Sequence, residues 1–481
     1  MTNTKKLVLN IILTFIYAVF TLFVVLHHEV WVDEVQVWQI AKYLNIFELF
    51  KHLVNEGHPS LFYLILMPFA KMKFSILAMQ IICWLSSTLG VFLLLHFSPF
   101  KWWSKLAIIL SAGFLYYFPV IARNYSLLPL LVFGTAVLYD KRKEKPVLYS
   151  LALFLISQVH VIMFAFVALL TLYFGLEAKK DNRINGKTIT AFSLMCLGLL
   201  LVIAQLCFTI QSNSAIGEVG GFDKTLIVNV FVEFFANTLN DMSLIVIPFI
   251  SFILWGYFLF MVGALFKKSK KMFFLVLLSV GFQLGIYVAA YPYFVYGTRI
   301  FSAYLILIFA YWIVLSENNK SEKQVRILNI LLAVLFFLST YNGFLNCYKD
   351  IKQPYSGSAP MAQFILKNID KNNSVIFYQQ PNVMVPLIYY LEDYDTLYVP
   401  YKEDLKFVKW DKRINKLMSL EVWGQFMNKY LKENEDSKDK EIYILQRKDY
   451  YLPVENTEII FVSEGYKAHW ENFVLSKFNN K

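Results

Sequence analysis

Residues 5–34 read KKLVLNIILTFIYAVFTLFVVLHHEVWVDE: two lysines, an apolar stretch from about Leu7 to Leu26, and a polar segment that ends in two carboxylates. A helix needs about 20 apolar residues to cross a bilayer. The stretch is longer than the core of a signal peptide, and no small-x-small cleavage site follows it, so we expect it to stay as a transmembrane helix. Because the lysines precede it, the positive-inside rule places the WVDE segment (31–34) outside the cytoplasm.

The composition extends this prediction to most of the chain. Of 481 residues, 58% are hydrophobic and only 16% are charged, and the mean hydropathy is +0.51, whereas a soluble protein carries about 25% charged residues. The formal charge of +11 could indicate a nucleic-acid partner, but Lys and Arg gather in runs between apolar segments, such as 141–145 and 267–271. Such runs are typical of cytoplasmic loops beside anionic lipid. We therefore expect membrane lipids as partners and no nucleic acid.

The cysteines indicate neither a disulfide framework nor a metal site. They lie in or beside apolar segments and lack CxxC spacing, so we interpret them as small hydrophobic side chains. The four are Cys83, Cys196, Cys207 and Cys347.

Hydropathy and the positions of the basic runs predict a polytopic all-α membrane domain over residues 1–344, with about eleven transmembrane helices. The predicted spans are 7–26, 74–95, 106–121, 125–139, 147–158, 161–176, 188–210, 243–266, 272–290, 300–315 and 327–344. Residues 27–73 form the first extracytoplasmic loop, with an interfacial amphipathic helix over 35–54 and a short apolar helix over 61–70. Residues 211–242 read as a polar loop. Several spans are short, which fits a cavity cut into one side of the bilayer.

From about residue 345 the composition is that of a soluble protein, and we expect a small extracytoplasmic α/β domain over 345–481. Short strand-like runs, helix-like segments and a terminal hairpin support this prediction. The strand-like runs are 374–378, 396–400 and 441–445, the helix-like segments are 361–369 and 419–435, and the hairpin pairs 458–462 with 471–478. The sequence contains no nucleotide-binding motif and no internal repeat.

Ionisable and polar side chains collect at the predicted outer ends of the helices. Each taken alone has an ordinary structural explanation: a carboxylate can cap a helix, and an arginine can reach lipid phosphates. Their convergence on one side of an apolar chain favours a functional explanation. A potential base beside guanidinium groups suits chemistry on a phosphate-linked substrate. The candidates are Asp33, Glu34, Glu56, His58, Arg123, Tyr125, His160, Tyr296 and Arg299.

Three of these motifs carry a family resemblance. WVDE (31–34), EGHPSLFY (56–63) and ARNYSLL (122–128) resemble the GT-C superfamily of membrane glycosyltransferases. The most similar group is the family 39-like one that includes protein O-mannosyltransferases and aminoarabinose transferases. The resemblance covers roughly residues 1–315 well and the C-terminal domain loosely. Two details depart from the commoner pattern: Ser60 follows the His-Pro pair where a second Pro is usual, and the usual Thr-His pair is absent at His160.

The resemblance implies transfer of a sugar from a polyprenyl-phosphate donor to an extracytoplasmic lipid, wall polymer or protein, with inversion. Asp33 would act as the general base on the acceptor hydroxyl, and Glu34 would orient it. Guanidinium groups would stabilise the charge that develops on the lipid phosphate. The expected substrate-binding residues are Glu56, His58, Arg123, Tyr125, His160, Tyr296 and Arg299. No cofactor and no metal is expected.

Two other functions fit a polytopic chain. A lipid or glycan transporter or flippase should place charges in the middle of its helices and often has repeated halves with broken helices, whereas the charges here lie at the outer rim. A non-catalytic scaffold that presents the C-terminal domain to a partner would not need carboxylates, histidine and arginine around one cavity. The residues therefore favour an enzyme over both alternatives.

Overall fold

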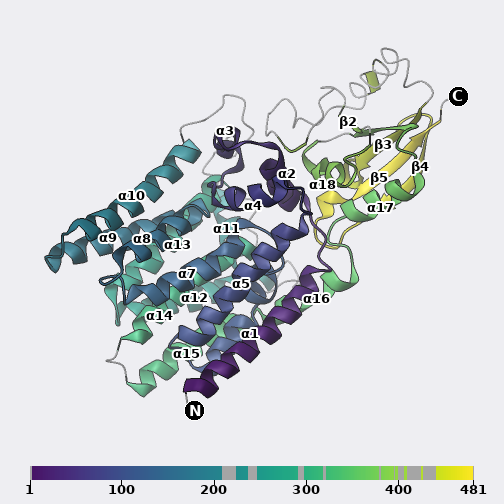
Figure 1. Ribbon diagram of the computed structural model, residues 1–481. Coiled ribbons are helices and arrows are strands. Elements are labelled where there is room, and N and C mark those ends of the chain that lie inside the picture. The colour runs from purple at the N-terminus through teal and green to yellow at the C-terminus, as the bar shows by residue number, and fades with distance from the viewer. Residues whose placement is uncertain are drawn as a thin grey trace.

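In the computed structural model, a bundle of long helices carries a small β-sheet domain at one end (Figure 1). The structure describes residues 3–207, 224–236, 246–290, 297–317, 321–378, 381–394, 396–398, 406–408, 424–425, 429 and 440–479. The side chain of Tyr296 and the predicted helix over 419–435, apart from three of its positions, lie outside these residues.

Within the described residues, eight helical stretches are long and apolar enough to cross a membrane. They are α1 (Asn3–Val25), α5 (Leu77–Phe97), η3 (Val161–Met163) with α9 (Phe164–Lys180), α10 (Gly186–Cys207), α12 (Val246–Phe266), α13 (Lys270–Ala290), α14 (Gly297–Ser316), and α15 (Glu322–Phe337) with α16 (Thr340–Lys352). Each overlaps a predicted span, so the predicted helical, polytopic membrane domain is confirmed. Helix α14 is the central one, because 94% of its apolar window is buried.

The other three predicted spans are helical but shorter. They correspond to α6 (Trp102–Ile109) with η1 (Gly113–Tyr117), to η2 (Asn124–Leu127) with α7 (Leu128–Tyr139), and to α8 (Pro146–Ser157). The first of them is interrupted, because η1 is a π-helical turn. The total of about eleven spans therefore stays a prediction beyond the eight long stretches.

The single interfacial helix predicted over 35–54 is wrong in its extent. The structure has α2 (Val32–Tyr43) and α3 (Ile46–Glu56) there, followed by α4 (Leu61–Lys71). The break comes at Asn45, because its Oδ1 accepts from the backbone N–H of Glu48 at 3.0 Å and Glu48 returns a bond to Asn45, which is a capping box. The residues of α2 from Glu34 to Ala41 are all buried within the protein, and the position of these helices at the membrane interface stays a prediction.

The predicted loop over 211–242 contains a helix, α11 (Lys224–Ala236), so the loop prediction is wrong for those residues. The helix packs against α12, where Trp255 Nε1 donates to the carbonyl of Phe231 at 2.9 Å. An apolar cavity of about 360 Å³ lies among α11, α12 and α13. Its lining includes Phe231, Phe252, Trp255, Phe258, Leu277 and Leu284.

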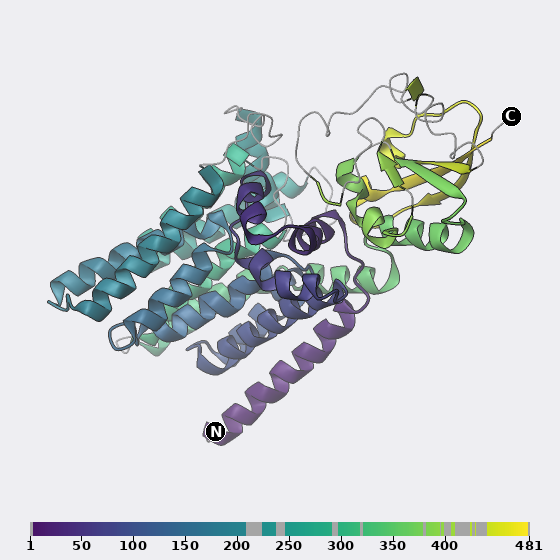
Figure 2. The same cartoon turned by 45° about the horizontal axis from the view of Figure 1, so that its top comes forward.

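The C-terminal domain is a mixed sheet with helices, as predicted. Strands β1 (Ser374–Tyr378), β2 (Thr396–Tyr398), β3 (Glu441–Arg447), β4 (Thr457–Ser463) and β5 (Phe473–Phe478) lie in the order β2-β1-β3-β5-β4, with helices α17 (Ser358–Asn368) and α18 (Pro381–Tyr390) and the short turns η5 (Lys448–Tyr450) and η6 (His469–Glu471). Strand β1 runs parallel to β2 and β3, whereas β5 is antiparallel to β3 and β4. Strands β4 and β5 form the predicted terminal hairpin. The domain lies at the end of the bundle that holds α2 (Figures 1 and 2).

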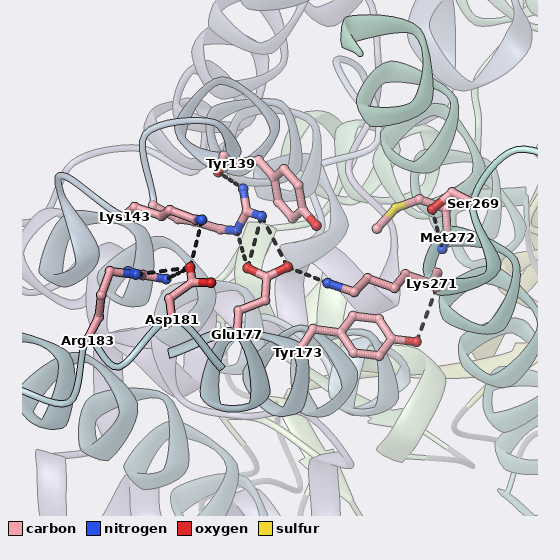
Figure 3. A network of polar contacts seen from close by, with 10 residues as sticks. Tyr139, Lys143, Tyr173, Glu177, Asp181, Arg183, Ser269, Lys271 and Met272 are labelled. Carbon is pink, nitrogen blue, oxygen red and sulfur yellow. Dashed lines mark hydrogen bonds and ion pairs between the residues drawn. The ribbon is translucent and has the colours of Figure 1, made fainter. Parts of the chain in front are cut away.

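The opposite end of the bundle gathers three loops that contain basic runs. Glu177 accepts from Arg142 at 2.9 Å and also pairs with Lys271, while Asp181 pairs with Lys143 at 2.7 Å. Figure 3 shows these carboxylates between cations that come from different helix ends. Ion pairs therefore hold the loops α7–α8, α9–α10 and α12–α13 together at one end.

Candidate active site

Asp33, Arg123 and His58 meet at the end of the bundle that carries the C-terminal domain. Asp33 lies on the first turn of α2, and its Oδ2 is 2.7 Å from Nη1 of Arg123. Nη2 of Arg123 donates to Nε2 of His58 at 3.2 Å. The Arg123 side chain is only 9% exposed, whereas that of Asp33 is 35% exposed. The guanidinium group thus links a carboxylate that solvent reaches to a buried imidazole.

Irregular backbone between the helices places two of these side chains. Helix α3 ends at Gly57, whose φ of 67° is in the left-handed region that favours glycine. The chain therefore turns sharply, and His58 follows at once. Arg123 directly precedes η2 and has extended backbone, so it lies in the irregular segment before the next helix.

Tyr125, His160 and Arg299 form a second group. The backbone N–H of Ile162 donates to Nδ1 of His160 at 3.1 Å, so the imidazole proton is on Nε2. That N–H donates to Oη of Tyr125 at 2.7 Å. Nε of Arg299 donates to the same Oη at 3.0 Å. Tyr125 therefore joins an imidazole of the α8–η3 turn to a guanidinium group of α14.

The rings of His58 and His160 connect the two groups, with a centroid distance of 4.6 Å. We call the whole set the arginine–histidine cluster. Its members are Asp33, His58, Arg123, Tyr125, His160 and Arg299. Six of the nine predicted site residues are thus brought together.

Both imidazoles in the cluster are neutral. Burial, reinforced by the charges of Arg123 and Arg299, lowers the pKa of His58 and that of His160 well below the usual value. Because Nε2 of His58 accepts from Arg123, its proton is on Nδ1. This buried Nδ1 has no partner at hydrogen-bonding geometry within the described part of the chain, although the backbone of Gly57 acts on the ring and partly offsets the lowering of its pKa, so a ligand could use this donor.

Glu34 is fully buried and contacts the backbone beside the cluster. Its Oε1 accepts from the N–H of Ala122 at 2.5 Å, and its Oε2 accepts from the N–H of Trp31 at 3.2 Å. Ala122 is the residue before Arg123. These contacts suit a carboxylate that fixes the backbone of Arg123 and the start of α2, so an orienting role for Glu34 stays a proposal.

Glu56 lies beside α2, at the edge of the site. Its Oε1 accepts from Nε2 of His52 and from Nε2 of Gln36, each at 2.9 Å. Its Oε2 accepts from Oη of Tyr63 at 3.4 Å. Gln36 also exchanges two hydrogen bonds with the backbone of Val408, at 2.7 and 3.0 Å. Glu56 thus belongs to a contact between α2, α3 and the C-terminal domain.

Behind Glu34 lies a buried chain of charged groups that sequence reasoning missed. Nε2 of His28 is 3.2 Å from Glu34, and Nδ1 of His28 is 2.8 Å from Asp350. Burial opposes charging of this imidazole, but Asp350 and Glu34 outweigh it and raise the pKa of His28 to about 10. The only local signal is His28 itself, which follows the first apolar stretch, because its partner Asp350 lies 322 residues further along the chain.

The candidate site shows no metal-binding arrangement among the residues that the structure describes. In those residues, three or more His, Cys, Asp or Glu side chains nowhere gather closely enough to hold a metal ion. The predicted site residue Tyr296 lies outside the described residues.

The sequence matches no protein-family model and no curated protein. The structure is similar to that of ArnT from Cupriavidus metallidurans bound to undecaprenyl phosphate, with a TM-score of 0.53 and 10% sequence identity over 100% of both chains. At this identity the similarity shows the fold. The chain therefore has an ArnT-like architecture over its full length, in both the helical bundle and the C-terminal sheet domain.

Proposed function

We propose that the protein is a glycosyltransferase that moves a sugar from a polyprenyl-phosphate donor to an acceptor outside the cytoplasm. The observation that carries this proposal is the arginine–histidine cluster, in which two guanidinium groups and two neutral imidazoles lie beside a carboxylate that solvent reaches. Similarity to a protein solved with undecaprenyl phosphate, which is itself a polyprenyl phosphate, supports the class of donor.

The cluster suits a single displacement with inversion. Arg123 and Arg299 would hold the donor phosphate and stabilise the negative charge that grows on it. The acceptor oxygen forms a bond to the anomeric carbon from the opposite face, while the bond from that carbon to the phosphate oxygen breaks. The phosphate leaves with the electron pair as polyprenyl phosphate, and Asp33 takes the proton of the acceptor hydroxyl.

The neutral histidines fit the same reaction. Nδ1–H of His58 is a buried donor whose partner would be an oxygen of the bound substrate. Tyr125 and His160 would keep Arg299 in place through the shared Oη. Glu56 and Tyr296 stay candidate substrate contacts.

The apolar cavity among α11, α12 and α13 would take part of the lipid chain. Its lining is aromatic and aliphatic, including Phe252, Trp255 and Leu277, which suits an isoprenoid. The cavity shares no residue with the arginine–histidine cluster. We therefore assign it to the lipid chain and not to the reaction.

We further propose that the chain lies in the cell membrane with the cluster and the C-terminal domain outside the cytoplasm. The basic loops joined by Glu177 and Asp181 lie at the other end of the bundle, and basic loops favour the cytoplasmic side. A lipid or glycan flippase remains the second candidate function. The gathering of the cluster at one end, and not along a path through the bundle, favours the transferase.

The test is sugar transfer by the purified protein in nanodiscs, with a panel of radiolabelled polyprenyl-phosphate sugars and a lipid, wall-polymer and protein extract as acceptor. We expect one donor to give a labelled acceptor and free polyprenyl phosphate in equal amounts. Movement of labelled lipid between leaflets of proteoliposomes, with no transfer from any donor, would support the flippase instead.

A further inference from the structure

The loop between β4 and β5, residues 464–472, reaches α16 and the start of α2 from the C-terminal domain. Oη of Tyr466 donates to Asp350 of α16 at 2.8 Å. The ring of Trp470 lies 5.9 Å from that of Trp31, the residue before α2. Glu471, at the end of the same loop, is completely buried. The last part of the chain therefore packs beside the helix that carries Asp33.

Two glycines allow this loop to pack backbone against backbone on residues 355–357. The N–H of Gly357 donates to the carbonyl of Glu471 at 2.9 Å, and a Cβ at Gly357 would lie 2.4 Å from that oxygen. A Cβ at Gly465 would lie 2.3 Å from Cα of Ser356. Contacts this short exclude any side chain at both positions. The backbone of Glu471 is therefore held in one place.

Glu34 accepts from the N–H of Trp31 at the start of α2, and the Glu471 side chain supplies the acceptor for the next N–H, that of Val32. The N-cap residue of α2 is Trp31, and an indole N–H is a donor that cannot cap a helix start. Oε1 of Glu471 instead accepts from the N–H of Val32 at 2.9 Å, across 439 positions of sequence. Its Oε2 accepts from Oγ of Ser358 at 2.9 Å, which orients the carboxylate.

We propose that Glu471 is a positioning residue for Asp33, so that the C-terminal domain sets the geometry of the proposed base. Asp33 follows Val32 directly, so the first turn of α2 is held by Glu34 from within the membrane domain and by Glu471 from the C-terminal domain. This inference rests on the proposed function of Asp33. A displacement of about 1 Å in a reacting group can cost about 10²-fold in rate, so loss of this contact should lower turnover without touching the donor phosphate site.

The test compares Glu471→Ala with Glu471→Gln in the full-length protein in nanodiscs. We expect Glu471→Ala to lower kcat by about 10- to 100-fold, while the KM for the donor and the stoichiometry of polyprenyl-phosphate binding stay near wild type. Glu471→Gln should recover most of the loss, because its amide oxygen still accepts from Val32. The matched control is Leu475→Ala, which destabilises the same domain from a buried position in β5 and should leave kcat near wild type.

Hydrogen exchange at the α2 amides gives a readout that needs no activity. Exchange at Val32 to Val35 should speed up in Glu471→Ala and stay slow in wild type and Leu475→Ala. Unchanged exchange with unchanged kcat in folded Glu471→Ala would overturn the inference, as would an equal loss of kcat in Leu475→Ala at equal thermal stability. If the wild type transfers no sugar from any donor, the proposed function fails, and the exchange result alone decides whether Glu471 positions α2.

Discussion

Oδ2 of Asp33 lies 2.7 Å from Nη1 of Arg123, so the proposed base and the proposed phosphate ligand form an ion pair in the free protein. A guanidinium group presents several N–H donors in a fixed plane and can hold two anions at once. In the proposed reaction, a donor phosphate on Arg123 would share this guanidinium group with Asp33. Under the proposed function, one side chain therefore contacts both the base and the donor phosphate.

The first prediction concerns the two terminal nitrogens of the Arg123 guanidinium group. Arg123→Lys keeps the charge but cannot reach both Asp33 and His58, which Nη1 and Nη2 contact in the structure. We expect turnover to fall by about 10²-fold, the cost of one lost donor to a developing oxyanion. Steady-state transfer and thermal stability measure this effect. The matched control, Arg183→Lys in an exposed pair with Asp181, should keep wild-type turnover. Full activity in the Arg123 variant would leave Arg299 as the main phosphate ligand.

The second prediction concerns alkaline stability. The pKa of His28 is raised to about 10 from 6.5 in the unfolded chain, so the folded state holds this proton over that window. The stabilisation is complete below pH 6.5 and is lost as the pH rises to about 10. Glu29 and Glu471 have pKa values raised by burial to about 7 and about 8. Glu471 still titrates near pH 8, so the contribution of His28 is measured as the difference between wild type and His28→Gln.

The measurement is thermal unfolding of the purified protein at pH 8 and pH 9.5. We expect the wild-type Tm to fall by roughly 2 °C. His28→Gln should have a lower Tm that changes little over this range. Asp350→Asn removes one of the two carboxylates that raise the pKa of His28. The fall in Tm should therefore occur at lower pH in this variant than in wild type. A wild-type Tm that is flat between these pH values contradicts a charged His28.

Local signals in the sequence accounted for most of the fold. Apolar runs and basic loops identified the long helices, because a bilayer imposes its length on each span. The break between α2 and α3 was also readable, since Asn45 and Glu48 have the spacing of a capping box. The apolar spacing continues across this break, which is why it predicts one helix over 35–54 where the structure has two.

The site was predictable only in part, for a different reason. Outer-rim position was enough to bring Asp33, His58 and Arg123 into one hypothesis. The contacts behind the site join residues that are remote in sequence. Asp350 is 322 positions from its partner His28, and Glu471 is 439 positions from its partner Val32. No local pattern in a single sequence encodes such pairings. The buried setting of Glu34 was missed for the same reason.

The third prediction concerns sidedness. In a background with the four native cysteines replaced, Asn372→Cys lies on the exposed surface of the C-terminal domain and Glu144→Cys lies in an exposed basic loop at the other end of the bundle. A membrane-impermeant maleimide should label Asn372→Cys in intact cells and Glu144→Cys only after permeabilisation. The reverse pattern would place the arginine–histidine cluster in the cytoplasm.

The measurement that tests the central claim most directly is sugar transfer by purified Asp33→Asn beside wild type, in nanodiscs, with donor binding and thermal stability followed in parallel. Asparagine keeps the shape of the side chain but cannot take a proton at neutral pH. We expect turnover to fall by about 10²- to 10⁴-fold, the usual cost of losing a general base. Binding of the polyprenyl-phosphate donor should persist, because Arg123 and Arg299 remain. Near-wild-type turnover in a folded Asp33→Asn protein would contradict the assignment of Asp33 as the base.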